Sequence, residues 1–117
     1  MTPADIASLT GKAPVYLSPV TIAELTFGAE IASDPGVRQK RLAALRRLQS
    51  KPLLTIDAGT ATTFGGLAAT IKLQGKKPRS RIQDLWLASQ AIQLGHTLLT
   101  RNKRDFEDIP GLDLASI

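Results

Sequence analysis

The sequence predicts an α/β domain with a mostly parallel central sheet, and three observations support this fold class. Short apolar segments with strand character alternate with longer segments of helical periodicity. Capping residues, prolines and glycines bound the helical segments. The 117 residues, of which 43% are hydrophobic and 21% charged, are enough to build one hydrophobic core. We therefore expect a single domain spanning residues 1–117.

The first half of the chain is expected to form two helices after a short strand at residues 15–17. Ser18-Pro19 is typical of a helix start, because serine caps free backbone amides and proline has no amide to lose. Residues 20–28 are apolar on more than one face, which predicts a largely buried helix. After the turn signal Asp34-Pro35-Gly36, residues 37–48 continue as a helix with an apolar stripe between basic flanks.

The second half alternates strand and helix. We interpret Asp57 as the cap of a helix, because it lies where a strand meets a helical segment. Gly75 and Gly95 follow the last periodic residues of two helices, as glycine commonly does. The predicted elements are a strand at 51–57, a helix at 60–74, a basic loop at 76–80, a helix at 82–94, a strand at 96–100 and a last short strand at 112–114.

The charge of the chain indicates a polyanionic partner. A net charge of +5 and a pI of about 10.0 suit binding to nucleic acid or to an acidic protein. The alternative, that each basic cluster is a solvated helix face or loop, stays equally open at this point. The clusters are Arg38, Lys40, Arg41, Arg46 and Arg47; Lys76, Lys77, Arg79 and Arg81; and Arg101, Lys103 and Arg104.

Composition also limits the chemistry and the compartment. The chain has no cysteine, which excludes disulfides and thiolate metal sites. Its single histidine, His96, follows a turn and is better explained as a structural residue than as a catalytic one. Its apolar runs are far shorter than the roughly 18–20 residues that span a bilayer, and no charged leader with an apolar segment opens the chain. We expect a cytoplasmic protein.

Two of the ten carboxylates stand in unusual surroundings. Glu24 has apolar neighbours on both sides, and a buried ionised Glu costs several kcal/mol unless it is paired or bound to a cation. Asp84 lies in the first turn of an otherwise apolar helix. A favourable interaction with the helix dipole would also explain Asp84, and its position alone slightly favours that explanation.

The candidate polar residues fall near one edge of the expected sheet. Ligands of α/β sheets bind outside the carboxyl ends of the strands, and Glu24, Asp84 and the pair Asn102 and Asp105 lie on or just after elements that could open there. Several carboxylates without histidine or cysteine suit a hard cation, Mg²⁺ or Mn²⁺. Such ions promote the hydrolysis of phosphodiesters, so the residues alone indicate a metal-dependent nuclease as a hypothesis.

Three segments resemble motifs of the PIN-domain family. Residues 16–28 (YLSPVTIAELTFG) resemble its second-strand and helix motif, and residues 84–91 (DLWLASQA) its D-x-x-I-A-A helix. Residues 98–106 (LLTRNKRDF), followed by IPGL at 109–112, are similar to its C-terminal signature. The three segments occur in the same order as in that family. They are closest to those of VapC-type toxins of bacterial type II toxin–antitoxin systems, and the resemblance runs from about residue 15 to residue 114.

This resemblance implies an Mg²⁺- or Mn²⁺-dependent endoribonuclease that is neutralised by a cognate antitoxin. Such toxins cut structured RNA, commonly tRNA or rRNA, and form homodimers. By correspondence, Glu24 and Asp84 match the second and third acidic positions that hold metal. Asp105 matches the fourth, with Asn102 beside it as a group that contacts metal or water; which of these two points inward stays open. Thr100 is a further candidate for orienting a ligand.

The chain departs from the family pattern at its beginning. PIN domains form a three-layer α/β/α structure that begins with an apolar strand ending in Asp-Thr or Asp-Ser, and that Asp binds metal. Here no such strand precedes Asp5, so we do not assign Asp5 to the site. We expect an N-terminally incomplete domain in which residues 1–13 are a residual helical segment. A misplaced start, a degraded copy and completion by another chain would each explain this.

The incomplete acidic set leaves an alternative function open. A catalytically defective remnant would bind antitoxin or RNA without cleavage. A generic RNA-binding α/β domain is a third reading, which the aromatic content of 4% disfavours because single-strand binders stack bases on aromatic rings.

Overall fold

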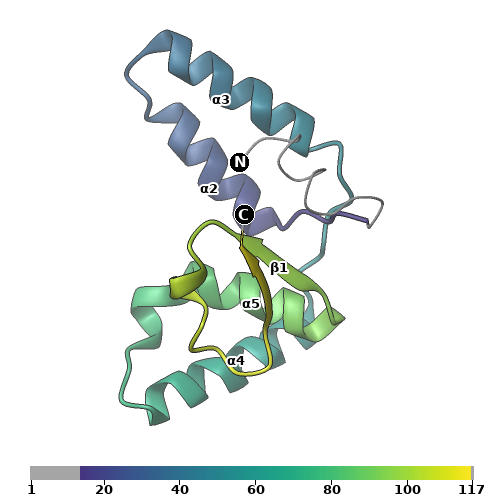
Figure 1. The fold of residues 1–117 in the computed structure, drawn as a ribbon, viewed down its shortest axis with the longest axis vertical. Helices are drawn as coiled ribbons and strands as arrows, with labels where there is room; N and C mark the ends of the chain where they lie inside the picture. Colours follow the sequence, from purple (N-terminus) through teal and green to yellow (C-terminus); the bar gives the residue numbers. More distant parts are fainter. Residues whose placement is uncertain (1–13, 117) are drawn as a thin grey trace. The chain divides into compact units, whose positions relative to one another are not determined.

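The computed structural model describes residues 14–116, which divide into two compact parts (Figure 1). One part ends at Thr55, and the other begins at Ile56. Two expectations concern residues outside the described range: that residues 1–13 are a residual helical segment, and that the first strand of the family is missing. That residues 1–117 form one domain stays a prediction. None of the helices in residues 14–116 has the length and hydropathy needed to cross a membrane.

Two helices that lie side by side dominate the first part: α2, Pro19–Glu30, and α3, Pro35–Leu48 (Figure 1). α2 begins as predicted, whereas α3 begins at Pro35, inside the expected turn, with Asp34 as its cap. The Ser18 hydroxyl accepts a hydrogen bond from the Val20 amide at 3.1 Å. The Asp34 carboxylate accepts one from the Gly36 amide at 2.9 Å. These caps satisfy amides that have no partner inside their helix, so both helix starts are fixed by local sequence.

Two expectations for the first part are wrong. Ala29 is the buried residue of α2, whereas Phe27 and Ile31 are 65% and 63% exposed, so the helix is not largely buried within the described structure. Its apolar residues are spread around the helix, and α3 covers one side. The predicted strands at 15–17 and 51–57 are reduced to one parallel bridge between Leu17 and Leu53. Pro52 lies in the second of these segments and has no amide to donate to a ladder.

The second part follows the predicted order of helix and strand. The helices α4 and α5 pack against each other, and β1 and β2 form a parallel pair in which Leu98 is opposite Leu114 (Figure 1). The basic loop contains a 3₁₀ turn, and a second 3₁₀ turn follows β1. The elements are α4, Ala58–Leu73; η1, Pro78–Arg81; α5, Ile82–Leu94; β1, Thr97–Thr100; η2, Lys103–Asp105; and β2, Asp113–Ser116.

Asp57 caps α4, as predicted. Its carboxylate accepts a hydrogen bond from the Thr60 amide at 3.0 Å, and the Thr60 hydroxyl accepts one from the Asp57 amide at 3.1 Å. The Gln93 amide group of α5 donates to the same carboxylate at 2.9 Å. These bonds are the main reason that the pKa of Asp57 is lowered, and they show a structural carboxylate with its oxygens in use.

The core of the second part joins the helices to the segment that follows β1. Ile71 of α4 and Leu85 of α5 are fully buried, and Phe106 and Ile109 pack into the same cluster. Burial of each such side chain contributes roughly 1.5–3 kcal/mol. Phe106 and Ile109 therefore anchor the segment that carries Asp105 against the two helices.

Candidate functional site

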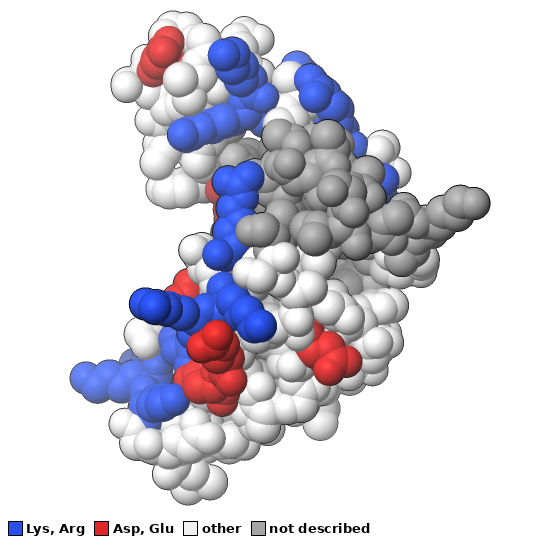
Figure 2. All heavy atoms as spheres, in the orientation of Figure 1, with Lys and Arg blue, Asp and Glu red and all other residues white. Residues whose placement is uncertain are grey.

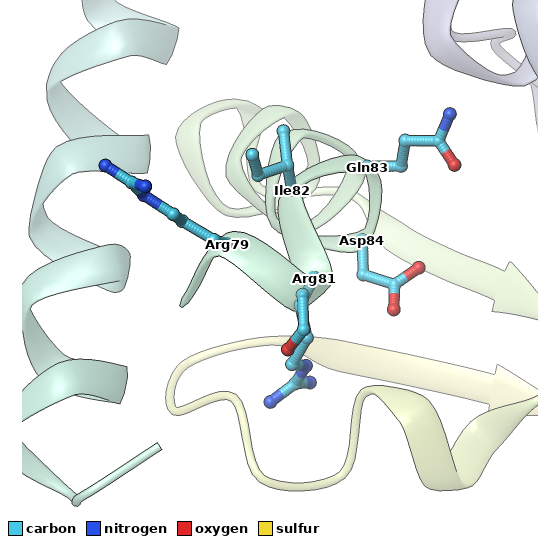
Figure 3. A pocket seen from close by; sticks show the side chains of 6 residues that line it. Arg79, Arg81, Ile82, Gln83 and Asp84 are labelled. Atoms are coloured by element: carbon cyan, nitrogen blue, oxygen red, sulfur yellow. The ribbon is translucent and has the colours of Figure 1, made fainter. Parts of the chain in front are cut away.

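Asp84 lies in the first turn of α5 and is half-buried. Figure 3 shows its carboxylate projecting from the start of the helix, while Arg81 reaches from the preceding turn toward the segment after β1. Arg79 and Gln83 point away on either side (Figure 3). The helix turn therefore presents one carboxylate and one guanidinium toward the region next to the end of β1.

Asp105 ends η2 and is exposed, and it directly precedes the buried Phe106. The structure brings Asp105 near Asp84. Burial raises the pKa of Asp84, and the charge of Asp105 raises it further, whereas Arg81 acts in the opposite direction. A like charge near a partly buried carboxyl disfavours its ionised form. Asp84 and Asp105, hereafter the acidic pair, are thus two carboxylates of the second part of which Asp105 acts electrostatically on Asp84.

A cluster of charged residues adjoins the acidic pair. Arg81 donates to both carboxylate oxygens of Asp108, from Nη1 at 2.6 Å and from Nη2 at 2.8 Å. Its Nη2 also donates to the backbone carbonyl of Asp105. The Lys76 ammonium donates to Asp108 at 2.7 Å. The bonds from Arg81 and Lys76 lower the pKa of Asp108 to about 2, although burial opposes this.

Sequence analysis did not find this cluster. It grouped Lys76 and Arg81 among basic residues and passed over Asp108. No sequence pattern indicates that Arg81 and Asp108 form a pair, because they are 27 residues apart. They meet only through the packing of the segment after β1 on α5. In the sequence, Arg81 is indistinguishable from a solvated residue of a basic loop.

Thr100 and Asn102 lie at the end of β1. The Thr100 hydroxyl accepts a hydrogen bond from the Asn102 amide at 3.1 Å, so Thr100 fixes the backbone at the point where the strand ends. The side chain of Asn102 is exposed.

Glu24 lies on α2, in the first part, and is exposed there. Glu24 was expected to lie on a buried face. This expectation is wrong, because α2 as a whole is not buried within the described structure. The argument from the cost of a buried charge therefore does not apply to Glu24, and its assignment depends on the resemblance of residues 16–28.

The chemistry of the acidic pair suits a divalent cation. Two carboxylates offer the oxygen ligands that Mg²⁺ and Mn²⁺ prefer, and a cation between like charges would relieve the repulsion that raises the pKa of Asp84. Among residues 14–116, no three His, Asp or Glu side chains are grouped closely enough to hold an ion. The described site thus supplies a pair of ligands rather than a complete set.

A cleft of about 310 Å³ opens beside Asp84. Its lining joins η1 to the first turn of α5, and Figure 2 shows Lys and Arg side chains next to a group of acidic ones on the visible face of this part. The mixture suits a ligand that carries negative charge and meets a cation at the carboxylates. The lining residues are Arg79, Ser80, Arg81, Ile82, Gln83 and Asp84.

Comparison with known proteins identifies the family to which this fold belongs. The family model described as the PIN domain matches residues 4–112. Ribonuclease VapC4 of Mycobacterium tuberculosis is 31% identical over 101 residues, which cover 86% of this chain and 75% of that protein. The tRNA(fMet)-specific endonuclease VapC of Shigella flexneri is 34% identical over 97 residues, which cover 82% of this chain and 70% of that protein.

Solved structures agree with this class. VapBC-1 of nontypeable Haemophilus influenzae superposes with a TM-score of 0.78 at 26% identity, over 97% of this chain and 85% of that chain. DNA-bound VapBC of Salmonella typhimurium gives 0.76 at 26% identity, over 97% and 82%. The chain belongs to the PIN-domain family, among its VapC-type toxins. The α/β fold class and the family resemblance of the sequence are thereby confirmed.

The raised pKa of Asp84 leads to a test of stability. A carboxyl whose pKa is higher in the folded state destabilises the fold as pH rises through that pKa, and it has no effect where both states are protonated. Without metal, Asp84→Asn is therefore expected to match or exceed the wild type at pH 7, by up to about 1 kcal/mol, and to equal it near pH 3. Urea unfolding in EDTA at both pH values measures this.

Asp108→Asn provides the control of opposite sign. The lowered pKa of Asp108 stabilises the fold above its ordinary pKa, and this contribution disappears as pH falls toward 2. We expect a loss of about 1–2 kcal/mol at pH 7, after allowance for solvent screening. A clear loss of stability in Asp84→Asn at pH 7 would contradict the electrostatic description of the acidic pair.

Proposed function

We propose that this chain is an Mg²⁺- or Mn²⁺-dependent endoribonuclease toxin that cleaves structured RNA and is neutralised by a cognate antitoxin. The observation that carries the proposal is the acidic pair, two coupled carboxylates on separate elements beside a cleft with a basic lining. Relatives that are named ribonucleases support the reaction. The relative named for tRNA(fMet) supports tRNA as substrate, with rRNA as the other candidate.

The acidic residues have distinct roles in this proposal. Asp84 and Asp105 bind the cation, and Glu24 is proposed as a metal ligand solely from its place in the motif of residues 16–28. Asn102 contacts the metal or a water through its side-chain amide. When bound, the cation neutralises charge on the scissile phosphate and lowers the pKa of an attacking water.

Exposed basic residues around the cleft would hold the RNA. The guanidinium of Arg81 is occupied by Asp108 and the carbonyl of Asp105, so it is not available to phosphate. Other basic side chains of the same elements are exposed and form no ion pair among the described residues: Lys77 and Arg79 beside the cleft, and Lys103 and Arg104 in η2. They can contact RNA phosphates without giving up an internal partner.

The partners follow from the same class. The similar solved structures include VapBC-1 of Haemophilus influenzae and DNA-bound VapBC of Salmonella typhimurium, which supports an antitoxin as the protein partner of this chain. We also propose that the chain acts as a homodimer in the cytoplasm, where tRNA and rRNA are found. The alternative is the remnant that binds antitoxin or RNA without cleavage, because the described site contains two coupled carboxylates rather than three.

Cleavage tests the proposal. Purified protein incubated with total tRNA and Mn²⁺ is expected to give discrete fragments, and EDTA should abolish them. Asp84→Asn and Asp105→Asn should each lower the cleavage rate at least 100-fold, since each removes a charged ligand whose electrostatic contribution is several kcal/mol. Glu24→Gln should also lower the rate, and Asn102→Ala by a smaller factor.

Asp113→Asn is the matched control, because Asp113 is an exposed carboxylate at the start of β2. It should retain full cleavage. If the wild type cuts neither tRNA nor rRNA yet binds antitoxin tightly, the enzyme proposal fails and the remnant takes its place.

The basic surface has its own test. In EDTA, which prevents cleavage, Lys77→Gln/Arg79→Gln should weaken tRNA binding and reduce the slope of log K against log salt by about one to two, since each phosphate contact releases a counterion. Lys40→Gln/Arg46→Gln makes the same change of charge at exposed positions on α3. Filter binding at several salt concentrations measures both. Equal losses in the two double variants would show that net charge, not this surface, governs binding.

A further inference from the structure

The contacts of Arg81 go beyond an ordinary surface ion pair. Arg81 ends η1, three residues before Asp84, and it bonds to Asp108 through two parallel hydrogen bonds of 2.6 and 2.8 Å. Paired bonds between a guanidinium and a carboxylate fix both distance and orientation. The side chains are 18% and 29% exposed, so solvent screens this pair less than it screens a fully exposed one.

A third bond extends this link to the acidic pair. Nη2 of Arg81 also donates to the backbone carbonyl of Asp105. Arg81 therefore holds the segment after β1 at two points, the carbonyl of Asp105 and the carboxylate of Asp108. Between these points, Phe106 is buried in the core, and Ile109 is buried just beyond them. Together these contacts restrict how far Asp105 can move from α5.

The acidic pair needs such a restraint. Asp84 and Asp105 carry like charges, which repel each other, and the bond from Arg81 to the carbonyl of Asp105 places Asp105 at the start of α5, where Asp84 lies. η2 is a single turn, whose hydrogen bonds do not reach α5. Without a tie to α5, the repulsion would favour conformations in which the exposed Asp105 turns away.

We propose that Arg81 and Asp108 act as a clamp that positions Asp105 beside Asp84, and that this clamp determines the affinity of the pair for a divalent cation. The proposal rests on the metal-dependent function proposed above, and Arg81 is a positioning residue in it rather than a ligand or an RNA contact. Lys76 adds charge to Asp108 from an exposed position but does not contact the segment at Asp105.

The direction in which the loss of Arg81 changes the affinity for Mn²⁺ distinguishes the clamp from a simple effect of charge. A positive charge near a cation site repels the cation, so the loss of Arg81 would tighten Mn²⁺ binding if charge alone mattered. If Arg81 acts as a clamp, its loss weakens binding because Asp105 is no longer held beside Asp84. Arg81→Lys retains the charge but not the paired bonds, and the clamp predicts weaker binding for this variant too.

The experiment is a titration of Mn²⁺ into RNA-free protein, followed by electron paramagnetic resonance of the free ion. We expect Arg81→Gln, Arg81→Lys and Asp108→Asn each to bind Mn²⁺ at least fivefold more weakly than the wild type. The double variant Arg81→Gln/Asp108→Asn should be no weaker than its single parents, because either change already opens the clamp. Lys76→Gln should differ from the wild type by less than about twofold.

Hydrogen exchange of the metal-free variants controls for loss of the fold. The amides of Asp105 and Phe106 should exchange faster in Arg81→Gln, while those in the middle of α4 keep their protection. Unchanged or tighter Mn²⁺ binding in Arg81→Gln would overturn the clamp, and so would exchange that rises equally throughout α4.

The failure of the clamp can be told apart from the failure of the proposed function. If the wild type binds Mn²⁺ but cuts no RNA, the proposed ribonuclease function is wrong, while the comparison of Mn²⁺ affinities among the variants still tests the clamp. A wild type that binds no Mn²⁺ overturns both.

Discussion

The proposed function of the second part depends on keeping two carboxylates of like charge close together. Asp84 is half-buried at the start of α5, and Asp105 lies after β1 on the segment that leads to Phe106. Burial of Phe106 draws this segment onto the helices. The guanidinium of Arg81 then ties it at Asp105 and Asp108. Apolar packing thus fixes the position of the segment, and the ion pair fixes its orientation.

This arrangement sets function against stability. The same burial and like charge that make Asp84 costly for the metal-free fold make the acidic pair a favourable place for a cation. Asp57 shows the contrasting case, since its carboxylate is satisfied by Thr60 and Gln93 and its pKa is lowered. Asp57 precedes α4 as its cap, whereas Asp84 lies inside the first turn of α5, where we propose that it binds the cation.

The sequence was informative wherever the cause is local. Ser18 and Asp57 identify two helix starts because each caps amides a few residues away, and the motifs identify Asp84 and Asp105 as candidates. It failed where the cause is tertiary. The exposure of α2 depends on which of its faces another element covers, and the pairing of Arg81 with Asp108 depends on packing across 27 residues. Periodicity and capping rules carry no information about either.

The most direct test of this account locates the cation itself. Mn²⁺ broadens the NMR signals of nearby nuclei steeply with distance, so substoichiometric Mn²⁺ added to ¹⁵N-labelled, RNA-free protein identifies the residues around it. We expect the amide signals in the first turn of α5 and in η2, around Asp84 and Asp105, to broaden first, and the signals around Asp57 to stay sharp. Broadening that begins around Asp57, or that is uniform across the chain, would contradict it.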